Sequence, residues 1–192
     1  MPTRNSSARE QVLELLKEDH KHVKKHFREF EKMEPEQDPQ ACHALVMRVC
    51  DELEVHARIE EELFYPAARR ALAEKEGEDL IDEAEVEHNS LKQLIAELRG
   101  LTPQDPKFKA NFTVLGEYVK HHVKEEEGEM FEKLGRAKID WEPLLQDMLD
   151  RQQELKADKD LTDANEPDVE VAMHASRGGR TAKPAAPSRS AR

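Results

Sequence analysis

The sequence has few aromatic residues and few glycines for its 192 residues. Aromatic residues make up 5% of the chain and glycine occurs seven times, whereas charged residues make up 38%. Sheet proteins need β-branched and aromatic strands, so this composition argues against a sheet fold. It is typical of helices with solvent-facing outer surfaces, in a chain long enough for one domain with a real core.

The chain also has two cysteines, no long apolar run and no excess of positive charge. Cys42 and Cys50 would lie about 12 Å apart on one expected helix, too far for a disulfide, so a reducing, cytoplasmic compartment is expected. Neither a run of about 18 apolar residues nor an apolar start is present, so we expect no membrane span and no secretory signal. The net charge of -12 makes the chain a poor candidate for binding nucleic acid, which needs a basic surface.

Four long stretches carry apolar residues at helical spacing, and loops separate them. The first begins near Ser7, which has capping-box spacing to Glu10, and ends before Pro35. The second begins at Asp38, which is a suitable N-cap because a proline follows at the first helical position.

Prolines and glycines also mark the later boundaries. Pro66 lies inside the second stretch, and we expect it to kink rather than end a helix that continues up to Gly77. The third helix is expected from about Asp79 to Arg99, and the fourth opens at Asp105, again followed by proline. Because the connections are short, neighbouring helices should be antiparallel.

The four stretches form two hairpins with the same inward pattern. Adding 68 to the inward positions of the first stretch gives those of the third, and adding 66 takes the second onto the fourth. The superimposed positions are Leu13, Leu16, His20, Val23, Phe27 and Phe30 on Ile81, Ala84, His88, Leu91, Ile95 and Leu98, and Val46, Val49, Leu53, His56, Glu60 and Phe64 on Phe112, Leu115, Val119, His122, Glu126 and Met130. This repeat predicts an all-α protein, an antiparallel up-down four-helix bundle over residues 8–135, with hairpins at about 8–75 and 78–135.

The chain after the bundle has two further parts. Residues 140–157 include WEPLLQDMLDRQQEL, which predicts a short amphipathic fifth helix that could cap one end of the bundle. Residues 160–192 lose apolar periodicity, which predicts a disordered C-terminal tail.

Six polar residues interrupt the inward stripes at matching positions in the repeat. They are His20, His56, Glu60, His88, His122 and Glu126. Burying a carboxylate or an imidazolium without a partner costs several kcal/mol, so six such groups at one level need a strong common partner. A metal would supply it, because a metal replaces protons on imidazoles and balances glutamate charge. The alternative is a proton-sharing polar core without metal.

The spacing indicates how such a site would be built. His56 and Glu60 are four residues apart, as are His122 and Glu126, so each pair lies on one helix face. Four imidazoles and two carboxylates exceed what one tetrahedral zinc needs. Two octahedral ions, each with two histidines and sharing two bridging glutamates, would use every ligand and leave positions open for solvent, oxygen or peroxide.

This arrangement, over roughly residues 10–135, resembles the ligand set of the hemerythrin HHE cation-binding family, the bacterial hemerythrin-like proteins. The acidic runs EEELFYP and EEEGEMF, which contain Glu60 and Glu126, belong to the resemblance. It implies two iron ions with an oxo or hydroxo bridge, held inside an antiparallel four-helix bundle. Affinity alone does not select iron over zinc or manganese.

One position departs from the oxygen-carrying members of that family. They have a further histidine four residues after the third-helix ligand, where this chain has Lys92, a poor ligand while protonated. This argues against a reversible oxygen carrier and leaves more coordination open. Tyr118 and Glu52 precede ligand histidines by four residues and Glu85 by three, so each is a candidate extra ligand or a group that orients the histidines.

Other polar residues near the ligands have simpler interpretations. His22 and His26 are also four residues apart but lie off the inward face, so we expect a solvated pair rather than a second metal site. We assign His121 to the flank of its helix. The remaining acids in the runs at 60–62 and 125–127 are expected to be solvated surface.

The sequence therefore favours a di-iron protein that binds or reduces a small oxidant (oxygen, peroxide or nitric oxide), a chemistry suited to oxidative-stress protection. Turnover as an oxidoreductase is left open. The alternatives are an oxygen or iron sensor or an iron-storage protein without turnover, and, third, a metal-free helical interaction module. The sequence does not specify an oligomeric state.

Overall fold

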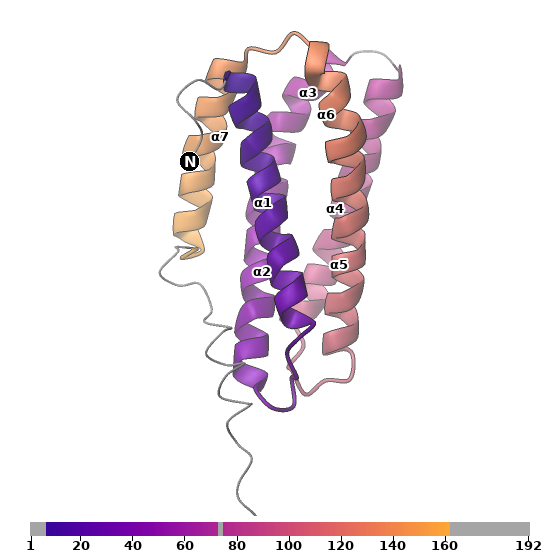
Figure 1. The fold of residues 1–192 in the computed structure, drawn as a ribbon, viewed down its shortest axis with the longest axis vertical. Helices are drawn as coiled ribbons and strands as arrows, with labels where there is room; N and C mark the ends of the chain where they lie inside the picture. Colours follow the sequence, from indigo (N-terminus) through magenta and orange to yellow (C-terminus); the bar gives the residue numbers. More distant parts are fainter. Residues whose placement is uncertain (1–6, 73–74, 162–192) are drawn as a thin grey trace, which may run out of the picture.

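The computed structural model describes residues 7–72 and 75–161, and in these residues it contains helices and no strand. The four long helices are α1 (Ala8–Phe30), α2 (Pro39–Ile59), α4 (Lys75–Arg99) and α5 (Phe108–Glu125) (Figure 1). Each packs against two others, α1 and α4 both contacting α2 and α5. The predicted all-helical antiparallel bundle is confirmed, and the expected disordered tail lies, from residue 162 onward, outside the described residues.

Two of the helices continue through short π-helical segments. α2 passes through Glu60–Phe64 into α3 (Tyr65–Ala71), and α5 passes through Glu126–Met130 into α6 (Phe131–Lys133) and a 3-10 turn (Leu134–Arg136). The backbone N–H of Tyr65 donates to the Glu60 carbonyl, and that of Phe131 donates to the Glu126 carbonyl, five residues earlier in each case. Both segments therefore begin at an inward glutamate of the repeat, and π-helical turns are frequent at functional sites.

Side-chain caps begin the helices of the first hairpin as expected. The Ser7 hydroxyl accepts from the Glu10 N–H at 3.3 Å, the Glu10 carboxylate accepts from the Ser7 N–H at 2.8 Å, and Asp38 accepts from the Ala41 N–H at 3.0 Å. The prediction for Asp105 was wrong. Its carboxylate accepts from the N–H of Thr102 at 2.7 Å, which closes the preceding loop, and α5 begins three residues later at Phe108.

The expected extension of the second helix to Gly77 was also wrong, although the helix does continue past Pro66. α3 ends at Ala71 because Leu72 has φ -107° and ψ 39°, and α4 has begun by Lys75. Gly77 lies inside α4 and marks a close approach. A Cβ there would be 2.5 Å from the Leu72 Cβ and 2.6 Å from the Leu72 carbonyl oxygen, so only glycine fits.

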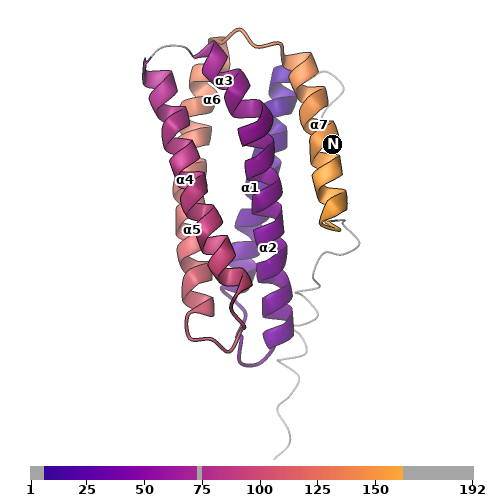
Figure 2. The ribbon, with the colours of Figure 1, turned by 180° about the vertical axis from the view of Figure 1, so that it is seen from behind.

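The fifth predicted helix is α7 (Trp141–Asp158), and it does not cap an end of the bundle. Figures 1 and 2 show it lying alongside α1 and α2, which it contacts. Its buried Leu144, Met148 and Leu155 join the core next to α1 and α3. The apolar stripe of α7 therefore packs against the side of the bundle. The sequence pattern shows that the helix has a buried face, but it does not show whether that face covers a side or an end.

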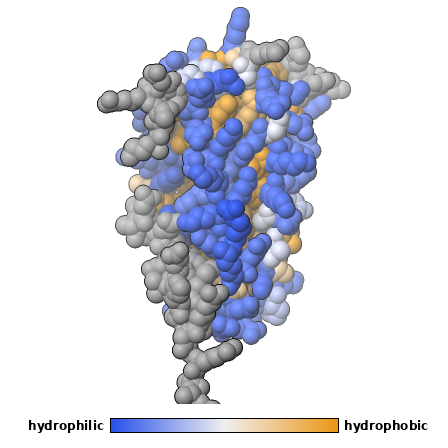
Figure 3. Space-filling view, in the orientation of Figure 1, coloured by the Kyte–Doolittle hydropathy of each residue, from blue (hydrophilic) through white to orange (hydrophobic). Residues whose placement is uncertain are grey.

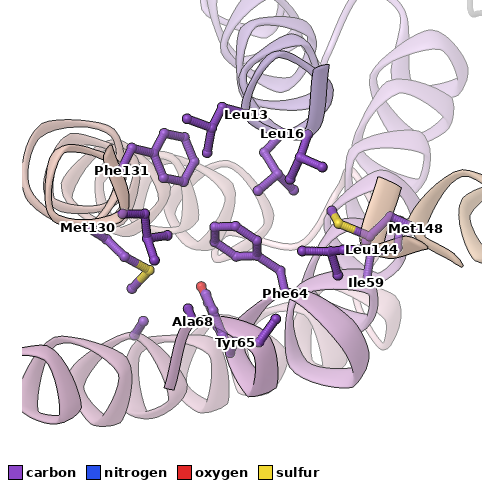
Figure 4. Close-up of a cluster of buried hydrophobic side chains, with 14 of the residues drawn as sticks. Leu13, Leu16, Ile59, Phe64, Tyr65, Ala68, Met130, Phe131, Leu144 and Met148 are labelled. Atoms are coloured by element: carbon purple, nitrogen blue, oxygen red, sulfur yellow. The ribbon is translucent and has the colours of Figure 1, made fainter. Parts of the chain in front are cut away.

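The apolar core is divided into two clusters. One contains Leu16, Phe64 and Tyr65 and includes the residues from α7 (Figure 4), and the other contains Leu45, Phe112 and Leu115 near the opposite end of the helices. Figure 3 shows that the face seen in the orientation of Figure 1 is mostly hydrophilic where it is coloured, as the charged composition suggested. No helix among the described residues is long and apolar enough to cross a bilayer.

Candidate metal centre

The six polar residues singled out by the repeat meet between the two apolar clusters. Each long helix contributes one histidine, and each π-helical segment contributes its first residue. All six are nearly inaccessible to solvent: His20 is 3% exposed, His56 5%, Glu60 0%, His88 1%, His122 3% and Glu126 2%. They form two overlapping groups that share Glu60, and in each group the potential ligand atoms lie within 4.8 Å of one another.

The histidines point their Nε2 atoms at one another in pairs. His20 Nε2 lies 3.0 Å from His56 Nε2, and His88 Nε2 lies 3.2 Å from His122 Nε2. Two nitrogens bound at about 2.1 Å to one octahedral ion would be about 3.0 Å apart. The observed separations match this value, which is also that of a hydrogen bond between two imidazole nitrogens, so the tautomer of each ring decides between the two.

Each of the four rings turns its Nδ1 atom to a carboxylate. The Nδ1 contacts are His20 with Glu127 at 2.9 Å, His56 with Asp19 at 3.5 Å, His88 with Glu61 at 3.0 Å, and His122 with Glu87 at 2.8 Å. An ionised carboxylate can only accept, so each Nδ1 carries the hydrogen and a neutral ring presents a lone pair at Nε2. In each pair two lone pairs then face each other, and a cation must lie between them.

Without a metal, a proton serves as that cation. Burial disfavours the imidazolium form of His56, but Glu60 and Asp19 outweigh burial and raise its pKa well above the ordinary value. For His88, burial is likewise outweighed by Glu60 and Glu61, which raise the pKa to about 9. The pairs thus attract positive charge strongly, as metal sites do when their ligands must exchange protons for the ion.

The two buried glutamates lack the hydrogen bonds that such groups normally have. Within the described residues, Glu60 Oε1 and both carboxylate oxygens of Glu126 have no hydrogen-bond partner. Glu126 Oε2 lies 3.2 Å from His20 Nε2, but not in hydrogen-bonding geometry. Burial and the nearby charge of Glu60 raise the pKa of Glu126, whereas Glu60, despite its burial, is held well below its usual pKa by His56 and His88. These oxygens suit a cation, since a metal accepts electron pairs where a protein donor is missing.

The four carboxylates that contact Nδ1 were missed at the sequence level, and two of them were wrongly expected to be solvated surface. They follow the repeat, because adding 68 takes Asp19 onto Glu87 and adding 66 takes Glu61 onto Glu127. The available signal was an acid directly before the first histidine of each hairpin and an acid directly after each inward glutamate. Such partners fix the tautomer and orientation of metal-binding histidines.

Tyr65 is a further central group that the sequence pattern did not identify. It is fully buried, and its hydroxyl donates to Glu60 Oε2 at 3.4 Å and lies 3.3 Å from His88 Nε2. Burial, with the charges of Glu126 and Glu60, raises the pKa of this phenol well above its usual value. The equivalent residue of the second hairpin is Phe131, so the phenol oxygen makes the two halves of the centre chemically different.

The three candidate extra groups lie elsewhere. Tyr118 is 47% exposed on α5. The Glu52 carboxylate accepts from Arg48 Nε at 2.6 Å, and the Glu85 carboxylate accepts from Arg69 at 3.0 Å on the surface. Their spacing from the histidines predicted positions near the inward face. Tyr118 instead lies on the exposed side of α5, and the carboxylates of Glu52 and Glu85 pair with arginines.

Lys92 and the histidines outside the centre have defined partners. Lys92 Nζ donates to Glu61 Oε1 at 2.6 Å, so the residue at the missing histidine position supports the carboxylate that holds His88. His121 is exposed and lies 3.2 Å from Glu125, on the flank as expected. The interpretation of His22 and His26 as a solvated pair was wrong for His26, which is 1% exposed.

Helix α7 also contacts the centre, through two side chains that lie against Asp19. Gln152 Nε2 donates to Asp19 Oδ2 at 2.9 Å, and Lys156 Nζ lies 3.6 Å from Asp19 Oδ1. Asp19 in turn holds His56. Glu87, its equivalent in the second hairpin, pairs with His121 at 3.5 Å instead, so within the described residues α7 supports only the first hairpin's half.

A small cavity adjoins the four histidines. Its volume is about 20 Å³, and the rest of its lining is mainly apolar, including Val23, Leu91 and Val119. A cavity needs roughly 10–15 Å³ by this measure to hold one water, so there is room for a small molecule only. The arrangement can therefore hold a pair of cations beside a small apolar chamber.

Comparison with known proteins is consistent with this geometry. The family model described as Hemerythrin HHE cation binding domain matches residues 11–134. A DNA nickase from Nostoc sp. is 28% identical over 120 residues, which are 62% of this chain and 32% of the relative, so the chain spans about a third of that protein's length. The crystal structure of a hemerythrin HHE cation binding domain-containing protein from Mycobacterium kansasii superimposes with a TM-score of 0.64 at 25% identity, covering 85% of this chain and 96% of that one.

Proposed function

Because this chain belongs to the hemerythrin HHE cation-binding domain family, we propose that its central cluster holds two iron ions and binds or reduces a small oxidant. The observation that carries the proposal is the pairing of Nε2 atoms at 3.0 and 3.2 Å, with every Nδ1 atom on a carboxylate. We propose residues 8–135 as the unit that binds the metal, in a cytoplasmic protein whose two cysteines are buried and free.

The ligand roles follow from the two groups of side chains. His20 and His56 would hold one ion and His88 and His122 the other. Glu60 lies in both groups, so it could serve both ions, whereas Glu126 lies in the group with His20 and His56. When bound, a pair of ferrous ions supplies two electrons together to a small oxidant such as oxygen or peroxide, or binds nitric oxide. The carboxylates keep the hydrogen on each Nδ1, so that Nε2 stays available as a ligand.

The rest of the chain controls access. The apolar lining, with Val23, Leu91 and Val119, excludes bulk water and admits only molecules with a few heavy atoms. The missing fifth imidazole at Lys92 supports binding or reduction over reversible oxygen carriage, because the lysine is engaged with Glu61 rather than with the centre.

The proposal is tested by following peroxide with iron-loaded protein. We expect near-ultraviolet absorption of a bridged ferric pair and rapid peroxide consumption that is abolished in His122→Ala. The matched control is His43→Ala, which removes a histidine of α2 that lies outside the centre and packs near Phe108, and it should keep both activity and spectrum. A protein that takes up no iron after anaerobic loading would contradict the proposal and leave the metal-free helical module.

A sensor or iron reservoir is the second candidate, and the contact of α7 with the centre through Asp19 favours it. That helix would report the state of the iron to a partner. Stable binding of oxygen or nitric oxide without peroxide turnover would support this candidate over the enzyme.

A further inference from the structure

A second cluster of metal-binding side chains lies between α1 and α2, outside the central six. His22 and His26 are one turn apart on α1, with ring centroids 4.6 Å apart. Glu52 reaches them from α2, with Oε2 at 3.1 Å from His26 Nδ1 and Oε1 at 3.5 Å from His22 Nδ1. One potential ligand atom from each residue lies within 4.8 Å of the other two.

The geometry points to a third cation site formed by His22, His26 and Glu52, for zinc or a chemically similar divalent ion. Two imidazoles and one carboxylate are a donor set of zinc sites that keep a coordination position open for water or another small ligand. Histidines four residues apart share one helix face, so both can reach one ion without any change of backbone.

The surroundings hold two of these three residues in place. His26 is 1% exposed, and the Glu52 side chain is 10% exposed. Arg48 donates to Glu52 Oε1 at 2.6 Å while Oε2 faces His26, which fixes the carboxylate as outer partners of metal ligands do. The His22 side chain, 40% exposed, lies at the mouth of the cluster and gives an ion a way in.

The repeat shows that the bundle does not need these residues for packing. Their equivalents in the second hairpin are Ser90 for His22, Leu94 for His26 and Tyr118 for Glu52, none of which forms a similar group. Leu94 fills the position of His26 with an ordinary apolar side chain. A buried histidine costs more than a leucine at such a position, so the first hairpin carries a chemical feature that the fold alone does not explain.

A polar cavity of about 130 Å³ opens beside the cluster. Its lining includes His22, Glu52, Arg48 and Lys156, together with Asp19. An open coordination position facing this cavity would receive water, since charged side chains of both signs line the cavity. The site would therefore be reached from solvent between α1, α2 and α7, and not through the apolar chamber of the central cluster.

The test uses the full chain with its central cluster already loaded with iron, to which cobalt(II) is added as the probe. We expect one cobalt ion per chain beyond the iron, with visible d–d absorption of a nitrogen- and oxygen-bound ion. His22→Ala and Glu52→Gln should each weaken cobalt binding at least about tenfold while leaving the iron content unchanged. His22 is half-exposed, so its substitution should not affect folding.

His43→Ala is the matched control, because it removes a histidine of α2 that lies outside the cluster and packs near Phe108. It should bind cobalt as the unaltered chain does. The inference is overturned if the unaltered chain binds no cobalt beyond the central sites, if both cluster variants bind it equally well, or if His43→Ala loses it to the same extent. Iron is counted separately in every sample, so failure of this inference is distinct from failure of the di-iron proposal.

Discussion

The hydrogen on each central imidazole is placed by a carboxylate, and this placement decides what the centre can bind. Glu61 and Glu127 hold His88 and His20 through Nδ1 at 3.0 and 2.9 Å. Without the carboxylate, a ring can turn or change tautomer and present an N–H to the centre instead of a lone pair. These acids are therefore as important for orientation as the ligands are for binding.

Glu61→Ala and Glu127→Ala should each weaken iron binding by about 10–100-fold, the range expected when an orienting partner of a metal ligand is lost. The measurement is iron retention against a competing chelator. Glu62→Ala is the control, because Glu62 lies in the same π-helical segment but pairs with Arg151 at 2.7 Å on the surface. Equal iron loss in Glu61→Ala and Glu62→Ala would show that the effect comes from the segment and not from the Nδ1 contact.

Tyr65 should provide an oxygen ligand to one of the ions, because its hydroxyl lies 3.3 Å from His88 Nε2 and 3.4 Å from Glu60 Oε2. The raised pKa keeps the phenol protonated in the metal-free centre, and a ferric ion would displace that proton, as metals do when they bind their ligands. Phenolate bound to ferric iron absorbs visible light. Tyr65→Phe should abolish a visible band of the ferric protein while keeping its iron, whereas Tyr118→Phe should leave the spectrum unchanged. A visible spectrum that is the same in Tyr65→Phe and in the unaltered chain would refute this role.

The sequence identified the six central residues because they break an apolar stripe at repeated positions. It did not identify Glu61 or Glu127, since an acid beside another acid in a run of glutamates has the pattern of solvated surface. Tyr65 was missed for a related reason, because an aromatic residue after phenylalanine fits ordinary core packing. The roles of Glu61, Glu127 and Tyr65 depend on contacts between helices, and the spacing of residues along one helix does not describe such contacts.

Among the elements, the π-helical segments do most to shape the centre. In a regular helix, residues five apart point about 140° away from each other. The π-helical hydrogen bond from the Tyr65 N–H to the Glu60 carbonyl brings such residues toward one face, so Glu60 and Tyr65 both point inward. An apolar repeat with steps of three and four does not reveal one extra residue in a turn, which is why the sequence predicted a kink at Pro66 instead.

Helix α7 supports only one half of the centre, and this asymmetry can be measured. Gln152→Leu removes the donor to Asp19 and places an apolar side chain of similar size in the same buried position. We expect iron release to become biphasic, with the ion held by His20 and His56 lost about tenfold faster and the other unaffected.

Gln153→Leu is the control for this experiment, because it makes the same change at the neighbouring exposed residue. It should release iron as the unaltered chain does. Uniform acceleration of both ions in Gln152→Leu would indicate a general loss of stability and contradict a specific link through Asp19.

At the scale of the whole molecule, the two hairpins surround a layer of buried polar groups with apolar cores on either side. Each Nε2 pair, and the glutamate oxygens without partners, needs a cation to be stable there. The sequence repeat predicted this organisation, because it gave both the helix faces and the level of the polar layer. The place of α7 along the side of the bundle was not predictable, since an amphipathic stripe does not indicate which surface it covers.

Removal of the metal should therefore lower the melting temperature. A ligand present at 100 times its dissociation constant stabilises the native state by about 2.7 kcal/mol, and about 1 kcal/mol corresponds to roughly 2–4 °C in a chain of this size. We expect chelation to lower Tm by at least about 5 °C, measured by calorimetry, and iron to restore it. The His122→Ala variant should show a smaller shift, and an unchanged Tm on chelation of the unaltered chain would contradict a stabilising role of the metal.

The central claim is most directly tested by anomalous X-ray diffraction at the iron edge from crystals of the iron-loaded protein. Two iron peaks should lie inside the bundle, one between the Nε2 atoms of His20 and His56 and one between those of His88 and His122. No iron peak among these four histidines, or a single ion bound elsewhere on the chain, would contradict the account.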